Sequence, residues 1–61
     1  MADDAQKLAF SMIRMYGPGA ADEAQKYVTK YQRSRDKENQ ATWDRVVSII
    51  RKHAEAKGHD Q

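Results

Sequence analysis

The sequence predicts an all-α fold. Apolar residues recur at spacings of three and four in three segments, which is the pattern of helices that bury one face. A Gly17-Pro18-Gly19 run separates the first two segments, and both residue types are unfavourable inside helices. Strand signals are minimal, because valine and isoleucine fall at helical rather than alternating positions. We expect three helices, over about 3–16, 20–34 and 37–56.

The first helix, about 3–16, begins with acidic residues and ends at the glycine turn. Asp3 and Asp4 suit the positive end of the helix dipole. Gly17 can adopt the left-handed conformation that closes a helix, and Pro18 cannot extend one. The apolar stripe of this segment is Ala5, Leu8, Ala9, Met12 and Tyr16, widened by Phe10 and Ile13.

The second helix, about 20–34, carries Asp22 and Glu23 in its first turn, where they suit the dipole and can pair with Lys26. Its small residues, Ala20 and Ala24, allow a neighbouring helix to approach closely. Its larger apolar positions are Tyr27, Val28 and Tyr31.

The second break has no glycine or proline. Residues 32–40 contain no large apolar side chain, and Asp36 is a suitable N-cap for the third helix, about 37–56. A single long bent helix is the alternative here. We favour a turn, because a short chain must fold back to bury Trp43. The third apolar stripe is Trp43, Val46, Val47, Ile50 and Ala54, flanked by Ile49.

Sixty-one residues make one small domain, 1–61, with frayed ends expected near 1–2 and 58–61. The apolar fraction is 39%, against roughly 45–50% in ordinary domains, so the core is small and its net stability marginal. The expected core gathers residues from all three segments. They are Leu8, Met12, Tyr16, Ala24, Tyr27, Val28, Tyr31, Trp43, Val46, Val47 and Ile50.

Composition argues against several function classes. Serine and histidine residues fall in no catalytic pattern, so we expect no enzyme activity and no cofactor. His53 and His59 match no helical metal-ligand spacing, and cysteine is absent, so we expect no metal site. No apolar run approaches the ~20 residues that span a bilayer. The acidic start, Met1-Ala2-Asp3-Asp4, is unlike a secretory signal, which begins with basic residues.

The favoured function is a small non-enzymatic interaction protein, an adaptor or regulator. Four large apolar side chains lie outside a simple three-helix interface, and an exposed apolar surface indicates a protein partner or a second copy of the chain. These expected contact residues are Phe10, Ile13, Met15 and Ile49. A compact monomer with a broader core is the structural alternative, and a subunit that folds only inside a larger assembly is a third class.

The alternative function is DNA binding. The net charge is +2, but residues 26–37 hold five cations and only one acid, Asp36. A helix-turn-helix would read base edges from the start of its second helix, here Asn39, Gln40 and Thr42. A basic stretch can also be an ordinary solvated helix face. The expected phosphate contacts are Lys26, Lys30, Arg33, Arg35, Lys37 and Arg45.

The run Tyr16-Gly17-Pro18-Gly19-Ala20, followed by Ala24, Asp36 and Trp43-Asp44-Arg45-Val46-Val47, resembles a group of short alphaproteobacterial proteins. The resemblance covers roughly residues 5–52, and the chain departs from it at Arg35 and Asn39, where the group's pattern has glycine. The resemblance implies a helical architecture and a bacterial, cytoplasmic origin. The group has no assigned activity, so no site residues are implied.

Overall fold

The computed structural model describes the backbone of residues 4–58 and the side chains of residues 4–56. The described chain forms helix α1 (Asp4–Tyr16), a 3₁₀ turn η1 (Gly17–Gly19), helix α2 (Ala20–Arg33) and helix α3 (Lys37–Gly58), and it contains no strand. The prediction of an all-helical fold is confirmed. Helix α3 ends at Gly58, and Asp3 and the frayed ends expected at 1–2 and 59–61 lie outside the described residues.

Helices α1 and α2 are joined without a non-helical residue. Gly17–Gly19 forms one 3₁₀ turn that begins directly after Tyr16 and runs straight into Ala20. Gly17 has the expected left-handed conformation, with φ at 58°, and Pro18 occupies an early position of the turn, where its missing N–H costs nothing. The expected break is therefore a sharp bend in one helical run from Asp4 to Arg33. Between residues 4 and 58 the chain has two separated helical runs rather than three.

The separation between α2 and α3 is complete, so the alternative of one long helix through residues 32–40 is wrong. The Asp36 amide donates to the Tyr31 carbonyl at 2.9 Å, and the Arg35 amide donates to the Gln32 carbonyl at 3.2 Å. These two bonds form a Schellman motif, in which the residue after the C-cap is left-handed. That residue is Arg35, whose φ is 60°.

Asp36 then starts α3 as its N-cap, as the sequence predicts. Its carboxylate accepts from the Asn39 backbone amide at 3.2 Å and from the Asn39 side-chain amide at 2.7 Å. Its carbonyl accepts from the Gln40 amide at 2.9 Å, the first bond of the new helix. One short turn thus closes α2 and opens α3.

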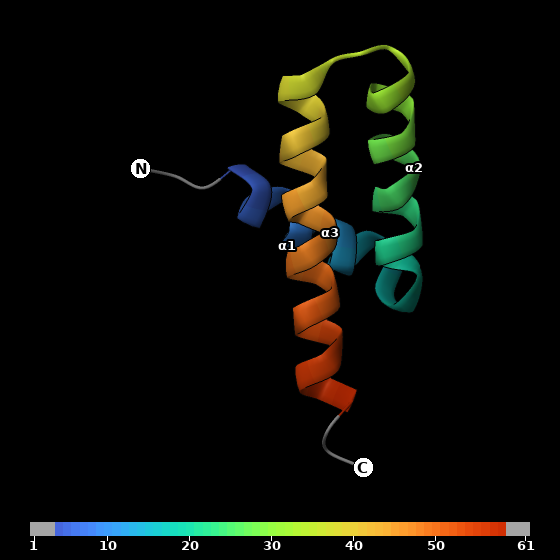
Figure 1. The fold of residues 1–61 in the computed structure, drawn as a ribbon. Helices are drawn as coiled ribbons and strands as arrows, with labels where there is room; N and C mark the ends of the chain where they lie inside the picture. The colour runs from blue at the N-terminus through green and yellow to red at the C-terminus, as the bar shows by residue number, and fades with distance from the viewer. Residues whose placement is uncertain (1–3, 59–61) are drawn as a thin grey trace.

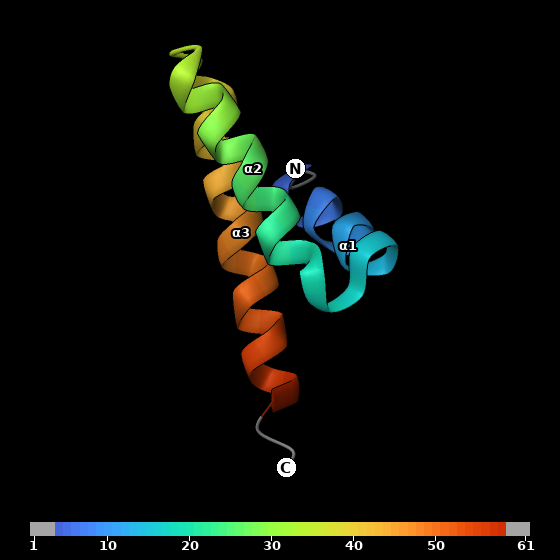
Figure 2. The same ribbon diagram turned by 90° about the vertical axis from the view of Figure 1, so that its right-hand side faces the viewer.

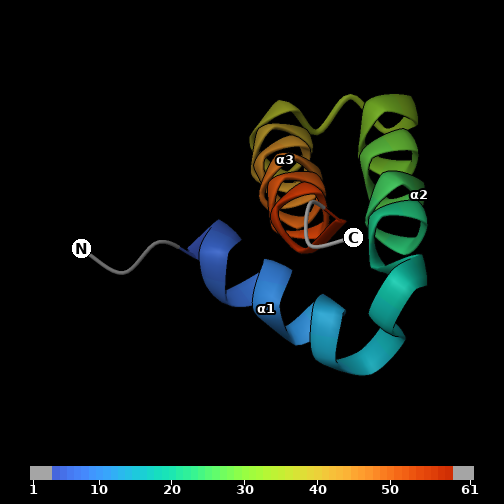
Figure 3. The ribbon, with the colours of Figure 1, turned by 90° about the horizontal axis from the view of Figure 1, so that it is seen from below.

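The turn returns α3 alongside α2, so the two helices form an antiparallel hairpin (Figures 1 and 2). Helix α1 crosses one side of this hairpin rather than running parallel to it (Figure 3). The C-terminal part of α3 extends past the N-terminal end of α2, where that helix begins (Figures 1 and 2). No helix among residues 4–58 is long and apolar enough to span a membrane.

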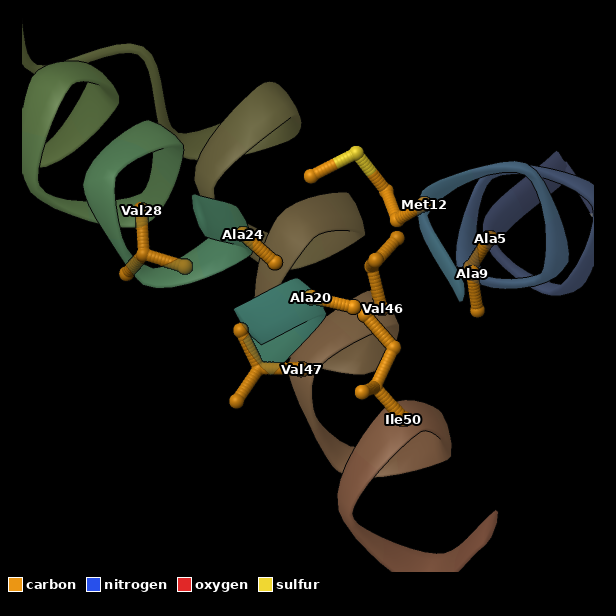
Figure 4. Close-up of a cluster of buried hydrophobic side chains, with 9 residues drawn as sticks. All are labelled: Ala5, Ala9, Met12, Ala20, Ala24, Val28, Val46, Val47 and Ile50. Carbon is orange, nitrogen blue, oxygen red and sulfur yellow. The ribbon is translucent and has the colours of Figure 1, made fainter. Parts of the chain in front are cut away.

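The core lies where the three helices meet, and small residues dominate it (Figure 4). Val46 of α3 is fully buried at its centre and is the largest side chain with that degree of burial. Around it, Ala9 of α1 and Ala20 and Ala24 of α2 are fully buried, which allows the helices to approach closely. The complete buried set is Ala5, Ala9, Met12, Ala20, Ala24, Val28, Val46, Val47 and Ile50.

Several core predictions are confirmed and others are wrong. Leu8, Tyr27 and Trp43 are half-buried and pack against the core. Tyr16 is 41% exposed, because it ends α1 at the bend and the chain turns away directly after it. Tyr31 is half-buried on the last turn of α2 and lies outside the core cluster. Ala54, which the sequence places on the third apolar stripe but not in the core, is exposed.

Candidate functional site

The four predicted apolar contact residues divide into two pairs. Ile13 and Ile49 are half-buried and pack against the core. Phe10 is 44% exposed and Met15 is 69% exposed. Of these four residues, the structure therefore leaves Phe10 and Met15 exposed at the surface and places Ile13 and Ile49 at the edge of the core.

Phe10 and Met15 border the solvent-facing side of α1. They are five positions apart, which corresponds to about 140° around a helix. Ser11 and Arg14 fall within that arc, and both are exposed. Ser11, Arg14 and Met15 also line a shallow, open depression. We call these four residues, Phe10, Ser11, Arg14 and Met15, the outer face of α1.

The ring of Phe10 is held at one edge by α3. The Phe10 and His53 rings are 6.0 Å apart between centroids and 85° apart in plane, an edge-to-face contact. The sequence places His53 at the margin of the third apolar stripe, but nothing in the spacing links it to Phe10. Phe10 therefore contacts α3 through His53 while 44% of its surface stays exposed.

Tyr16 is a surface residue that the sequence assigns to the core. It follows Met15 directly and is the third exposed large apolar side chain among the described residues. The available signal was its neighbour Gly17, because a residue at a helix end beside a bend has few residues to cover it. Tyr16 extends the exposed apolar surface from the outer face of α1 to the bend.

The six predicted phosphate contacts do not form one group. Lys26 lies along α2 and donates to the Glu23 carboxylate at 2.9 Å, as the sequence predicts. That hydrogen bond raises the pKa of the Lys26 ammonium group. Arg45 lies eight residues after Lys37, or about 12 Å further along α3. The remaining four cations gather where α2 turns into α3.

We call these four cations, Lys30, Arg33, Arg35 and Lys37, the hairpin tip. All are exposed. The Lys30 ammonium lies 5.6 Å from the centre of the Tyr31 ring, a cation–π contact on the same side of the turn. The nearby acids are Asp36, whose carboxylate caps α3, and the exposed Glu38. The tip therefore carries four exposed cations beside two acids.

The base-edge candidates at the start of α3 have partners within the chain. Asn39 donates its side-chain amide to Asp36, and the Thr42 hydroxyl donates to the Glu38 carbonyl at 3.2 Å. Gln40 is half-buried. The antiparallel α2–α3 hairpin also differs from a helix-turn-helix, whose helices cross at about 90–120°. This geometry favours contacts with the phosphate backbone of a nucleic acid over hydrogen bonds to the edges of its bases.

Comparison with protein-family models, with curated proteins and with solved structures finds no match to this chain. Among the residues that the structure describes, no group of three or more histidine, cysteine, aspartate or glutamate side chains could hold a metal ion. The same part of the chain buries no polar or charged side chain. The features that remain for a function are two surfaces, the outer face of α1 and the hairpin tip.

Proposed function

We propose that this chain is a small non-enzymatic interaction protein whose outer α1 face docks a protein partner. The partner is either a second copy of the chain or a larger protein. The proposal keeps the bacterial, cytoplasmic setting that the sequence resemblance implies. It assigns the contact to Phe10 and Met15, with Tyr16 at the edge.

One observation carries the proposal: three large apolar groups of α1, Phe10, Met15 and Tyr16, lie outside the core. The core is built mainly from alanine and valine, whereas Phe10, the only phenylalanine in the chain, is 44% exposed. Fully burying such a side chain stabilises a protein by about 1.5–3 kcal/mol. A partner that covers the outer face would bury apolar surface that the isolated fold leaves exposed to water.

The composition of the outer face suits such a contact. Phenylalanine, methionine and arginine are enriched at protein interfaces relative to the rest of the surface. Methionine adds a flexible, polarisable group that adapts to the shape of a partner. Phe10, Arg14 and Met15 bring all three residue types onto one exposed arc of a single helix. Docking of that arc into a groove follows ordinary helix-face recognition.

The first test compares the native chain with a Phe10→Ser/Met15→Ser variant. Sedimentation velocity over a range of concentrations detects a second copy, and affinity capture from source cells detects a larger partner. We expect association or capture for the native chain and its loss in the variant. Because both side chains are exposed, the variant keeps its helical far-UV circular dichroism spectrum.

The matched control is Gln25→Ser/Gln32→Ser, two exposed substitutions on α2. It should bind like the native chain. Equal binding by all three proteins would contradict the outer-face proposal, as would a native chain that stays monomeric and captures nothing. Weak helicity of the isolated native chain would instead favour the subunit that folds only in an assembly.

A further inference from the structure

We infer that the hairpin tip is a binding surface for the phosphate backbone of a nucleic acid, read by charge and not by base sequence. The inference goes beyond the proposed function and concerns a different surface. It is carried by two independent observations: the gathering of four exposed cations at one end of the hairpin, and the backbone conformation of Arg35.

The first observation is the charge at the tip. Lys30 and Arg33 come from the last turn of α2, Arg35 from the turn itself and Lys37 from the start of α3. The Schellman motif and the Asp36 cap hold the three segments together. Because the turn is this short, cations from both helices lie at one end of the molecule, opposite the bend at η1 (Figure 1).

The second observation is the left-handed backbone at Arg35. In a Schellman motif this position is usually glycine, which adopts a positive φ without strain. Arginine is held there at 60°, and its side chain is exposed. Residues held in strained backbone conformations cluster at functional sites, so this outlier points to a role for its side chain. What arginine adds here is a guanidinium group at the apex of the tip.

The chemistry of the surrounding surface favours a polyanion over a protein. Protein interfaces are centred on buried apolar or aromatic anchors, and stable attachment to a membrane surface usually combines charge with apolar insertion or a lipid anchor. The exposed large apolar residues of the described chain are Phe10, Met15 and Tyr16, and all belong to α1. Binding to a nucleic-acid backbone requires only cations that displace counterions from phosphates, which the tip supplies.

The residues that could have read base edges are engaged within the chain, which supports binding that does not depend on base sequence. Asn39 is held by Asp36, and the Thr42 hydroxyl is held within α3. Arg33 and Arg35 can each engage a phosphate through two N–H groups, whereas lysine acts as a point charge. The tip therefore contacts backbone phosphates, and its affinity should be similar for duplexes of unrelated sequence.

The test measures fluorescence anisotropy of a labelled mixed-sequence DNA duplex titrated with the full chain. If all four cations contact phosphates, log affinity falls against log salt with a slope of about −3 to −4. Arg33→Gln/Arg35→Gln should reduce the slope by about two and weaken binding at low salt by about tenfold or more. Duplexes of different sequence should bind within about twofold of one another.

The matched control is Arg51→Gln/Lys52→Gln, which removes the same charge from exposed positions far along α3. It should keep the native salt slope. An equal loss in the control would overturn the inference, because attraction would then depend on net charge alone. Equal or tighter binding of a polyglutamate peptide would also overturn it, in favour of an acidic protein partner.

Two single substitutions separate charge from backbone shape. Arg35→Gly keeps the left-handed turn and removes the guanidinium, so it should weaken duplex binding while the fold becomes more stable. Arg35→Lys keeps a cation and should retain most of the affinity. Unchanged binding by Arg35→Gly would contradict the role of Arg35. The tip variants should leave any protein docking at Phe10 and Met15 intact, so the two proposals fail independently.

Discussion

The indole ring of Trp43 lies nearly parallel to the ring of Tyr27, with centroids 4.3 Å apart and planes 18° apart. Both residues are half-buried and pack against the core. The stack links α2 to α3, the two helices of the antiparallel hairpin that α1 crosses. Aromatic pairs of this kind contribute about 0.5–1.5 kcal/mol beyond their burial.

Trp43→Ala should lower the free energy of unfolding by about 2–3 kcal/mol, less than for a fully buried tryptophan because the ring is half-exposed. Urea unfolding followed by circular dichroism measures this change. A double-mutant cycle with Tyr27→Ala should give a coupling energy of about 0.5–1.5 kcal/mol. A coupling energy near zero would show that the stacked geometry adds nothing to simple burial.

The buried alanines predict a strong penalty for larger side chains. Ala24→Leu places three extra carbons at a site with no exposed surface, and overpacking of this kind costs about 1–3 kcal/mol. Ala54→Leu makes the same change at an exposed position of α3 and should be nearly neutral. Thermal melts measure the difference between the two variants. Equal melting midpoints would contradict the close packing of helices around Ala24.

The bend predicts opposite responses at its two glycines. Gly17 has φ at 58°, so Gly17→Ala should destabilise the fold by about 1–2 kcal/mol, although open space surrounds the new methyl group. Gly19 has φ at −89° and equally open space, so Gly19→Ala should raise stability by about 0.4–1 kcal/mol. Chemical denaturation of both variants checks the sign, and a loss at both positions would argue against the turn geometry.

The strained turn residue predicts a stabilising substitution. Arg35→Gly relieves the positive φ and should raise the free energy of unfolding by about 0.5–1 kcal/mol. Arg33→Gly, two residues earlier at the last helical position of α2, should instead lower it by about 0.5 kcal/mol. Stability curves for this pair test the conformation of Arg35 without any ligand, and a lower stability for Arg35→Gly would refute it.

The N-cap of α3 predicts a loss at Asp36. Asp36→Ala removes the acceptor of the Asn39 amide and should cost about 0.5–2 kcal/mol. Asp44→Ala, at an exposed position inside α3, serves as the control and should change stability by less than about 0.5 kcal/mol. Equal effects in urea titrations would mean that the Asp36 cap contributes little.

Local signals determined much of this architecture. The 3.6-residue periodicity is a property of single segments, so the helices and the buried faces of Val46, Val47 and Ile50 follow from the sequence. The Asp36 cap and the Glu23–Lys26 pair follow for the same reason, since each involves residues three positions apart. The positive φ of Gly17 is likewise a local preference.

The tertiary structure decided how those segments meet. Whether Gly17–Gly19 ends a helix or bends it depends on the path of α2, and this path leaves Tyr16 exposed. The division of the apolar contact residues into half-buried Ile13 and Ile49 and exposed Phe10 and Met15 depends on which side of α1 faces α3. The gathering of cations at the hairpin tip depends on the antiparallel return of α3. Periodicity gives the direction of a side chain from its own helix axis, but exposure also depends on where the other helices lie, and packing of the whole chain sets that.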